Sequence, residues 1–279
     1  MILKLATTPE LHSEAVRAMI KLRAFGHTVE AIAPSISGDE RVDDAVLESV
    51  RSGEVDLAIL PFDRLRDRDQ AAAVLRREEP GDVLVARGPR AHTLRTLPPA
   101  WPVGVAGARR KALLRAHRPD LEPVPLENGQ SPPEAFAAGV VDAAVMGATE
   151  ARRAGLEAHI TEFQDNKAWL PAPQQGAVAV VVENGARDLL HAALDHDPTH
   201  AAVMCEGALA TRLDAWHAPL GAVALPSGPL IRLWAMLVSP DGQRVVRGDL
   251  TGRSSDPEGL AELMAEYMWA RGAEEVLLR

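Results

Sequence analysis

The chain has 279 residues, of which 47% are hydrophobic and 25% charged, a balance typical of a globular protein with room for two or three domains. Its formal net charge of −9 argues against a nucleic-acid-binding surface and gives no reason to expect binding to an anionic membrane. No apolar run approaches the roughly 18 residues of a membrane span, and the sequence shows no signal-peptide pattern. The single cysteine excludes an internal disulfide. We therefore expect a cytoplasmic protein.

Strand and helix patterns alternate from the first residues onward. Apolar runs predict strands at 2–6, 28–33 and 55–60, and amphipathic spacing predicts helices at about 13–25 and 42–51. Because a helix between two strands usually places those strands side by side and parallel, this alternation predicts parallel α/β units.

A short repeat indicates that the chain contains two such units. The segment GEVDLAIL at 53–60 matches GVVDAAVM at 139–146, and in both a glycine ends a helix before Val-Asp opens a strand. Doubled units of this kind also occur in periplasmic-binding-protein-like folds, in which crossover segments join two lobes around a ligand. The alternative is a common helix-to-strand turn that the chain uses twice. We favour the two-lobe interpretation.

Pattern breaks mark where the chain would pass between the lobes. Glu79-Pro80-Gly81-Asp82 interrupts the first pattern and predicts the first crossover. The segment 170–173, with two prolines, predicts the return crossover, after which 177–182 would re-enter the sheet of the first lobe.

The last part of the chain has a different character. Two apolar runs flank Ser239-Pro240-Asp241-Gly242, which predicts a hairpin, and a helix at 257–271 would lead into a final strand at 275–278. We therefore predict three domains, namely a first α/β lobe at 1–75 with 176–194, a second α/β lobe at 76–175, and a small C-terminal α+β domain at 195–279.

Two motifs near residue 200 resemble a known family. LPAPQQGAVAVVVE begins at Leu170 and CEGALATRLDAWHAPLG begins at Cys205. They resemble LPAxGQGAxxxE and ERAxxxxLxGGCxxPxG of the porphobilinogen deaminase (hydroxymethylbilane synthase) family. The resemblance implies a three-domain transferase of tetrapyrrole and heme biosynthesis, which joins four porphobilinogens to hydroxymethylbilane and releases ammonia.

The family's covalent dipyrromethane cofactor is attached to the cysteine of the second motif. Here that place falls on Asp214-Ala215-Trp216-His217, with one residue deleted, and the only cysteine lies about three helical turns earlier. The apolar neighbours of Cys205 predict an inert packed thiol. We therefore expect no cofactor in this chain.

Arginines that the resemblance assigns to substrate carboxylates are partly present. VGVAGARRK at 103–111 resembles the family's VGTSSLRR, which implies that Arg109 and Arg110 bind carboxylates, and Arg153 matches the arginine of KRLGL. Arginine suits this role because its planar guanidinium binds a carboxylate through two parallel hydrogen bonds. Without the family, these arginines would be interpreted as solvated helix charges.

Other positions depart from the family. Asp63 in LPFDRLR replaces the catalytic aspartate of HSMKDVP only after a one-residue shift, and the alternative is that Asp63 caps a turn after Pro61. Thr8, Gln130 and Glu134 stand where the family has arginines. The lid sequence Gly-Lys-Gly-Leu-Phe is deleted after 38–39.

Three further groups complete the candidate site. The resemblance places the backbone around Gln175 and Gly176 in the ligand cleft. His217, beside the lost cysteine, is a candidate acid or base, and the alternative is a surface histidine. Three histidines have a loosely metal-like spacing but span a helix end, so no metal is predicted. They are His191, His196 and His200.

Two functional hypotheses follow. In the first, the chain is a deaminase of tetrapyrrole biosynthesis in which Asp63 is the acid or base. In the second, it is a catalytically inactive paralogue that binds a small anionic ligand, such as porphobilinogen or a linear tetrapyrrole, between two lobes, or serves as a partner protein. In either case we expect a monomer.

Overall fold

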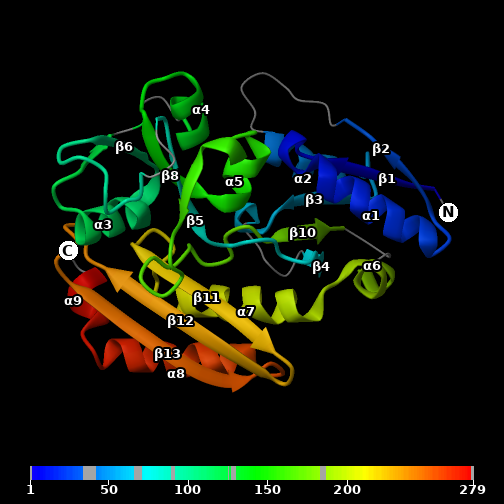
Figure 1. The fold of residues 1–279 in the computed structure, drawn as a ribbon. Coiled ribbons are helices and arrows are strands. Elements are labelled where there is room, and N and C mark those ends of the chain that lie inside the picture. Colours follow the sequence, from blue (N-terminus) through cyan, green and yellow to red (C-terminus); the bar gives the residue numbers. More distant parts are fainter. Residues whose placement is uncertain are drawn as a thin grey trace. The chain divides into compact units, whose positions relative to one another are not determined.

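The computed structural model describes residues 2–33, 42–65, 71–88, 92–124, 126, 130–182 and 187–277 (Figure 1). It divides into two compact units, Met1–Glu78 with Gly176–His200 and Glu79–Gln175 with Ala201–Arg279. The second unit thus groups the C-terminal residues with the second lobe, while the predicted boundaries at 75, 176 and 195 stay a prediction. In the part of the chain that is described, every helix is too short or too polar to cross a bilayer.

The first unit is built on a five-stranded sheet. Its spatial order is β2 (Thr28–Ala31), β1 (Ile2–Thr7), β3 (Leu57–Pro61), β10 (Val178–Val181) and β4 (Ala71–Val74). β1 runs parallel to β2 and β3, whereas β10 is antiparallel to both β3 and β4. The parallel units predicted from the sequence are confirmed, and the returning strand β10 lies between β3 and β4.

Amphipathic helices cover this sheet. They are α1 (His12–Ala24), α2 (Val42–Arg51) and α6 (Arg187–Leu194), with 3₁₀ turns η1 (Pro9–Leu11) and η2 (Phe62–Arg64). Ala15, Ala18 and Leu22 of α1, at helical spacing, pack with Leu3 and Leu5 of β1 in one buried cluster.

A second five-stranded sheet repeats the arrangement in the second unit. Its order is β7 (Glu122–Val124), β6 (Pro102–Val105), β8 (Ala143–Gly147), β5 (Asp82–Ala86) and β9 (Ile160–Phe163). β6 is parallel to β7 and β8, and β5 is antiparallel to β8 and β9. The repeated sequences lead into β3 and β8, which hold equivalent places in the two sheets. The two-lobe α/β fold predicted from that repeat is therefore confirmed.

Short helices accompany the second sheet. They are α3 (Gly107–His117), α4 (Pro132–Ala137), α5 (Ala148–Arg153) and the 3₁₀ turn η5 (Glu157–His159). Leu113 of α3 is buried in a cluster with Trp169, Val223 and Met236, so the second sheet shares a core with the C-terminal strands.

The C-terminal part is an antiparallel meander of β11 (Leu220–Ser227), β12 (Leu230–Val238) and β13 (Val245–Arg253), with α7 (Asp197–Arg212) and α8 (Pro257–Trp269). The predicted hairpin is confirmed, since Ser239 and Gly242 lie in the turn between β12 and β13. The predicted strand at 275–278 is wrong, because Ala273–Leu277 forms helix α9. Ala273 and Val276, three residues apart, are its buried positions, which is helical spacing.

Candidate functional site

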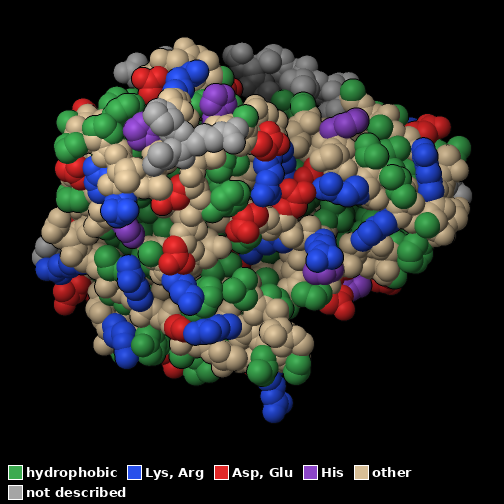
Figure 2. Space-filling view, in the orientation of Figure 1, with side chains coloured by type: hydrophobic (Ala, Val, Ile, Leu, Met, Phe, Trp, Pro, Cys, Tyr) green, Lys and Arg blue, Asp and Glu red, His purple; other side chains and the backbone are tan. Residues whose placement is uncertain are grey.

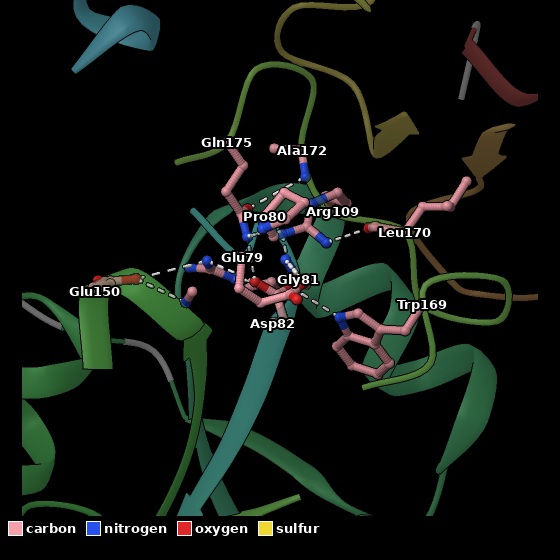
Figure 3. Close-up of polar contacts among 12 residues, drawn as sticks. Glu79, Pro80, Gly81, Asp82, Arg109, Glu150, Trp169, Leu170, Ala172 and Gln175 are labelled. Atoms are coloured by element: carbon pink, nitrogen blue, oxygen red, sulfur yellow. Dashed lines mark hydrogen bonds and ion pairs between the residues drawn. The ribbon is translucent and has the colours of Figure 1, made fainter. Parts of the chain in front are cut away.

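Asp82, the first residue of β5, lies at the centre of a buried polar cluster in the second unit (Figure 3). Its fully buried carboxylate accepts hydrogen bonds from Arg109 Nη2 at 2.8 Å, and from Arg110 Nη2 at 2.9 Å and Nε at 3.1 Å. Trp169 Nε1 and Gln175 Nε2 donate to the same carboxylate, each at 2.9 Å. Four side chains thus converge on one carboxylate.

The turn between β6 and α3 brings the two arginines to Asp82. Gly107 begins α3 with a φ of 78°, a conformation that glycine adopts without a steric penalty. Arg109 and Arg110 follow in the first turn of the helix. Sequence reasoning missed Asp82, although an acidic residue that opens the apolar run VLVA is a signal for a buried ion pair.

Both guanidinium groups are occupied within the protein. Arg109, only 7% exposed, also donates from Nη1 to Leu170 O at 2.6 Å and from Nη2 to Gln175 Oε1 at 3.1 Å. Arg110 lies 3.6 Å from Glu150 Oε2. A ligand carboxylate that approached these arginines would therefore meet cations already partly neutralised by internal carboxylates.

The two arginines determine the ionisation of Asp82. Burial alone would raise the pKa of Asp82, but the charges of Arg109 and Arg110 outweigh burial and hold that pKa well below its ordinary value of 3.8. Burial lowers the pKa of Arg109, and the nearby charge of Asp82 opposes that effect. The cluster therefore holds an ionised carboxylate at neutral pH.

The loop that carries the LPAPQQG motif is anchored by Glu206 of α7. Glu206 Oε2 accepts from Gln174 N at 2.5 Å, and Glu206 Oε1 accepts from Ala224 N of β11 at 2.9 Å. Gln174 has a φ of 64° and Gly176 one of 76°, so the turn needs left-handed backbone at two positions. This anchor fixes Gln175, whose Nε2 also donates to Pro80 O at 2.7 Å.

The other predicted site residues lie elsewhere. Asp63 is exposed in η2, directly after Pro61, and belongs to the first unit. Arg153 ends α5 and is half-buried, and His217 is exposed in the loop after α7. The structure therefore brings Arg109, Arg110 and Gln175 together, and within the second unit Arg153 and His217 are not among the side chains bound to Asp82.

The structure describes the three positions at which the resemblance expects arginines. Glu134 forms a capping box with Ser131 at the start of α4, since its Oε2 accepts from Ser131 N at 2.8 Å and Ser131 Oγ accepts from Glu134 N at 3.4 Å. Thr8 is fully buried, and its Oγ1 has no hydrogen-bond partner among the described residues. Gln130 is half-buried just before α4.

The only thiol of the chain lies in a helix core, as predicted. Cys205 of α7 is fully buried among Leu209, Leu220 and other apolar side chains. Burial, with a smaller contribution from the charge of Glu206, raises the pKa of the thiol to about 12. The segment on which the resemblance places the family's cysteine, Asp214 to His217, is a turn in which Asp214 has a φ of 48°.

A hollow of about 280 Å³ lies on the C-terminal sheet. Lys167 Nζ and Arg232 Cζ lie 5.7 Å and 5.0 Å from the centre of the Trp234 ring, and Arg232 makes a two-pronged ion pair with Asp249. Arg247 also lines the hollow and is exposed. Figure 2 shows basic and acidic side chains interspersed on the visible face rather than gathered by sign.

Comparison with known proteins gives a consistent family. Residues 40–191 match the family model described as porphobilinogen deaminase, dipyromethane cofactor binding domain. The chain is 36% identical over 238 residues to a porphobilinogen deaminase of Roseiflexus castenholzii, which covers 82% of this chain and 78% of the relative. It is 33% identical over 269 residues to a porphobilinogen deaminase of Desulforudis audaxviator, and this alignment covers 93% of this chain and 86% of the relative. It is 35% identical over 243 residues to a porphobilinogen deaminase of Thermus thermophilus, and this alignment covers 83% of this chain and 79% of the relative.

Solved structures with a related arrangement are more distant. A nutrient binding protein from Burkholderia cenocepacia bound to methionine has a TM-score of 0.43 at 16% identity, over 67% of this chain and 86% of that one. A lipoprotein from Treponema pallidum has a TM-score of 0.42 at 17% identity, over 67% and 85%.

Proposed function

Since the chain belongs to the porphobilinogen deaminase family of tetrapyrrole biosynthesis, we propose that it is a non-catalytic member that binds a small carboxylated pyrrole. The ligand is porphobilinogen or a linear tetrapyrrole. The observation that carries this proposal is the thiol: Cys205 is the only cysteine, and it is buried with a pKa raised to about 12. A protein without a reactive thiol has no atom to hold a growing chain as the family does.

The chemistry of the thiol supports the absence of a covalent cofactor. A thioether forms from a thiolate that reaches its electrophile, and a thiol with a pKa of about 12 is ionised in only about one molecule in 10⁵ at pH 7. The family model describes a dipyrromethane-binding domain, so the family uses this cofactor. We propose that this chain does not carry it, because Asp214 to His217 offer no sulfur.

Binding of a carboxylated ligand is supported by the charge of the polar cluster. Arg109 and Arg110 together carry two positive charges, and Asp82 neutralises one of them directly at 2.8–3.1 Å, while Glu150 lies farther away at 3.6 Å. One carboxylate side chain of a pyrrole would bind at the edge of this pair by replacing the more distant Glu150 beside Arg110. We propose as further ligand contacts Gln175, Gly176, Arg153 and His217. If the protein turns over porphobilinogen, Asp63 is the proposed acid or base.

Intact-mass spectrometry and titration calorimetry with porphobilinogen test the proposal together. We expect the mass of the unmodified 29.9 kDa chain and a saturable binding signal. Arg110→Gln removes one of the two cations and should weaken porphobilinogen binding at least about tenfold, since each charged hydrogen bond contributes roughly 1.5–3 kcal/mol.

The matched control is Arg247→Gln, which removes an exposed arginine from the hollow on the C-terminal sheet of the same unit. We expect unchanged porphobilinogen affinity in this variant. A mass increase that disappears in Cys205→Ala would overturn the proposal, and so would an affinity that depends on Arg247 and is indifferent to Arg110.

A further inference from the structure

A cluster of metal-ligating side chains lies in the first unit, apart from the polar cluster around Asp82. His191 is on α6, Asp195 follows directly after that helix, and His200 is in the first turn of α7. One ligand atom from each lies within 4.8 Å of the other two. The sequence predicted no metal because the histidines span a helix end, yet His191 and His200 come together, since the two-residue turn Asp195-His196 joins the end of α6 to the start of α7.

The geometry of the three side chains is nearly that of a metal site. His200 Nδ1 lies 2.9 Å from Asp195 Oδ1, and His191 Nδ1 lies 3.9 Å from the same oxygen. The two imidazole rings are 6.0 Å apart between centroids, at 71° to one another. Zinc with nitrogen and oxygen ligands at about 2.0–2.2 Å places its ligand atoms roughly 3.3–3.5 Å apart, so small ring rotations would close the site.

The carboxylate of Asp195 is held in place through one oxygen, while its other oxygen has no hydrogen-bond partner among the described residues. The Asp195 side chain is 3% exposed, and its Oδ1 accepts from Val74 N of β4 at 2.6 Å. Its Oδ2 is buried and has no hydrogen-bond partner among the described residues. A buried carboxylate oxygen without a partner is costly, and a metal ion supplies the missing positive charge.

We infer that His191, Asp195 and His200 form a binding site for a divalent transition-metal ion of the zinc class. Two imidazoles and one carboxylate are a ligand set that Zn²⁺ prefers, and three protein ligands leave a fourth position for water. His196 takes no part, because its Nδ1 lies 2.8 Å from Thr199 Oγ1. The bound ion would join α6, the end of β4 and the first turn of α7 in one corner of the first unit.

The test is isothermal titration of the chelator-treated full chain with ZnCl₂, together with a Co²⁺ absorption spectrum as a report on coordination geometry. We expect one Zn²⁺ per chain, a tetrahedral-type Co²⁺ spectrum, and a rise in Tm with zinc. His200→Ala and Asp195→Asn should each weaken zinc affinity at least tenfold. Asp195→Asn keeps an oxygen that can accept from Val74 N, so it separates loss of the ligand from loss of the fold.

His12→Gln provides the control, because His12 is an exposed histidine at the start of α1 in the same unit. Its zinc affinity should equal that of the parent chain. Absence of stoichiometric binding, or equal zinc affinity in the parent, His200→Ala and Asp195→Asn chains, would overturn the inference.

Discussion

Asp82 is the residue on which the charge balance of the second unit depends. Its carboxylate is fully buried, and Arg109 is 7% exposed. If either group were removed, water could not reach the other to compensate its charge. Removal of one partner from such a pair leaves a buried charge without compensation, which is far more costly than loss of an exposed ion pair. The cluster is thus a structural element of the fold whether or not a ligand binds to it.

The burial of Asp82 predicts a large stability difference between two aspartate variants. Asp82→Asn should lower the free energy of unfolding by about 3–5 kcal/mol, because Arg109 and Arg110 lose their buried counter-charge. Asp249→Asn removes an equally well-aligned partner of Arg232, but that pair is about half exposed, so we expect a loss under about 1 kcal/mol. Urea unfolding of the two variants checks this, and equal losses would contradict it.

The depressed pKa of Asp82 also predicts how stability changes with pH. A carboxyl whose pKa is lower in the folded than in the unfolded state stabilises the fold above the unfolded value near 3.8. That contribution is lost as pH falls from there through the folded pKa. We therefore expect the stability difference between the parent chain and Asp82→Asn to be constant from pH 5 to 7 and to shrink below about pH 4. A difference that grows with acid would refute this assignment.

The buried thiol predicts a clear chemical result. Cys205 should resist thiol reagents at pH 8 in the native protein, because it is both inaccessible and protonated, and should react at once in denaturant. Mass spectrometry after a short exposure to iodoacetamide with and without guanidinium checks this. Rapid labelling of the native chain would show that the thiol is reachable by a pyrrole as well.

At the scale of elements, the sequence predicted what depends on local pattern. The repeat at 53–60 and 139–146 identified the equivalent strands β3 and β8, and the hairpin between β12 and β13 follows from its turn residues. β4 was missed because AAAV has low strand propensity, and its strand state depends on pairing with β10. α9 was predicted as a strand because a five-residue segment is too short to distinguish the helical spacing of apolar residues from the alternation of a strand.

The site was less accessible to sequence reasoning than the fold. Arg109 and Arg110 were found through the resemblance, but their buried partner Asp82 lies 27 and 28 residues earlier, and its pairing depends on tertiary structure. The approach of His191 to His200 was missed for the same reason, since the turn between α6 and α7 decides which of the three histidines meet. Pattern determines which elements form, while contact between distant elements determines which side chains converge.

Contact between β11 and the motif loop predicts the effect of one glycine substitution. A Cβ on Gly221 would lie 2.7 Å from Leu170 Cβ and 2.9 Å from Leu170 O, so Gly221→Ala should destabilise the protein by about 1–3 kcal/mol. Gly147→Ala is the control, because a Cβ there meets side-chain atoms only at 3.5 Å and beyond. Thermal unfolding of both variants decides the matter, and an unchanged Tm in Gly221→Ala would show that the loop can withdraw.

At the scale of the whole molecule, family membership rests on most of the chain, whereas the proposed loss of catalysis rests on a few positions. The structure holds two repeated α/β sheets and a C-terminal meander, and the chain aligns with a relative named porphobilinogen deaminase over 93% of its length. The departures that the resemblance implies are the deleted lid sequence and single positions such as Thr8, Asp63 and Asp214. A scaffold depends on many weak contacts and tolerates such changes, whereas covalent catalysis depends on one nucleophile.

We therefore expect the isolated protein to form no measurable hydroxymethylbilane from porphobilinogen. The chain has no accessible thiol, its candidate acid or base Asp63 is exposed, and Thr8 and Glu134 stand where the resemblance expects cations. Loss of a nucleophile or an acid–base group typically lowers the rate by about 10²–10⁴-fold or more, and such losses do not simply add, yet either alone would bring turnover below detection. A porphyrin-forming assay beside the Thermus thermophilus deaminase, which is 35% identical, supplies the comparison. Turnover that matches this relative and vanishes in Arg110→Gln would mean that the chain holds its growing product through another atom, and the non-catalytic assignment would be wrong.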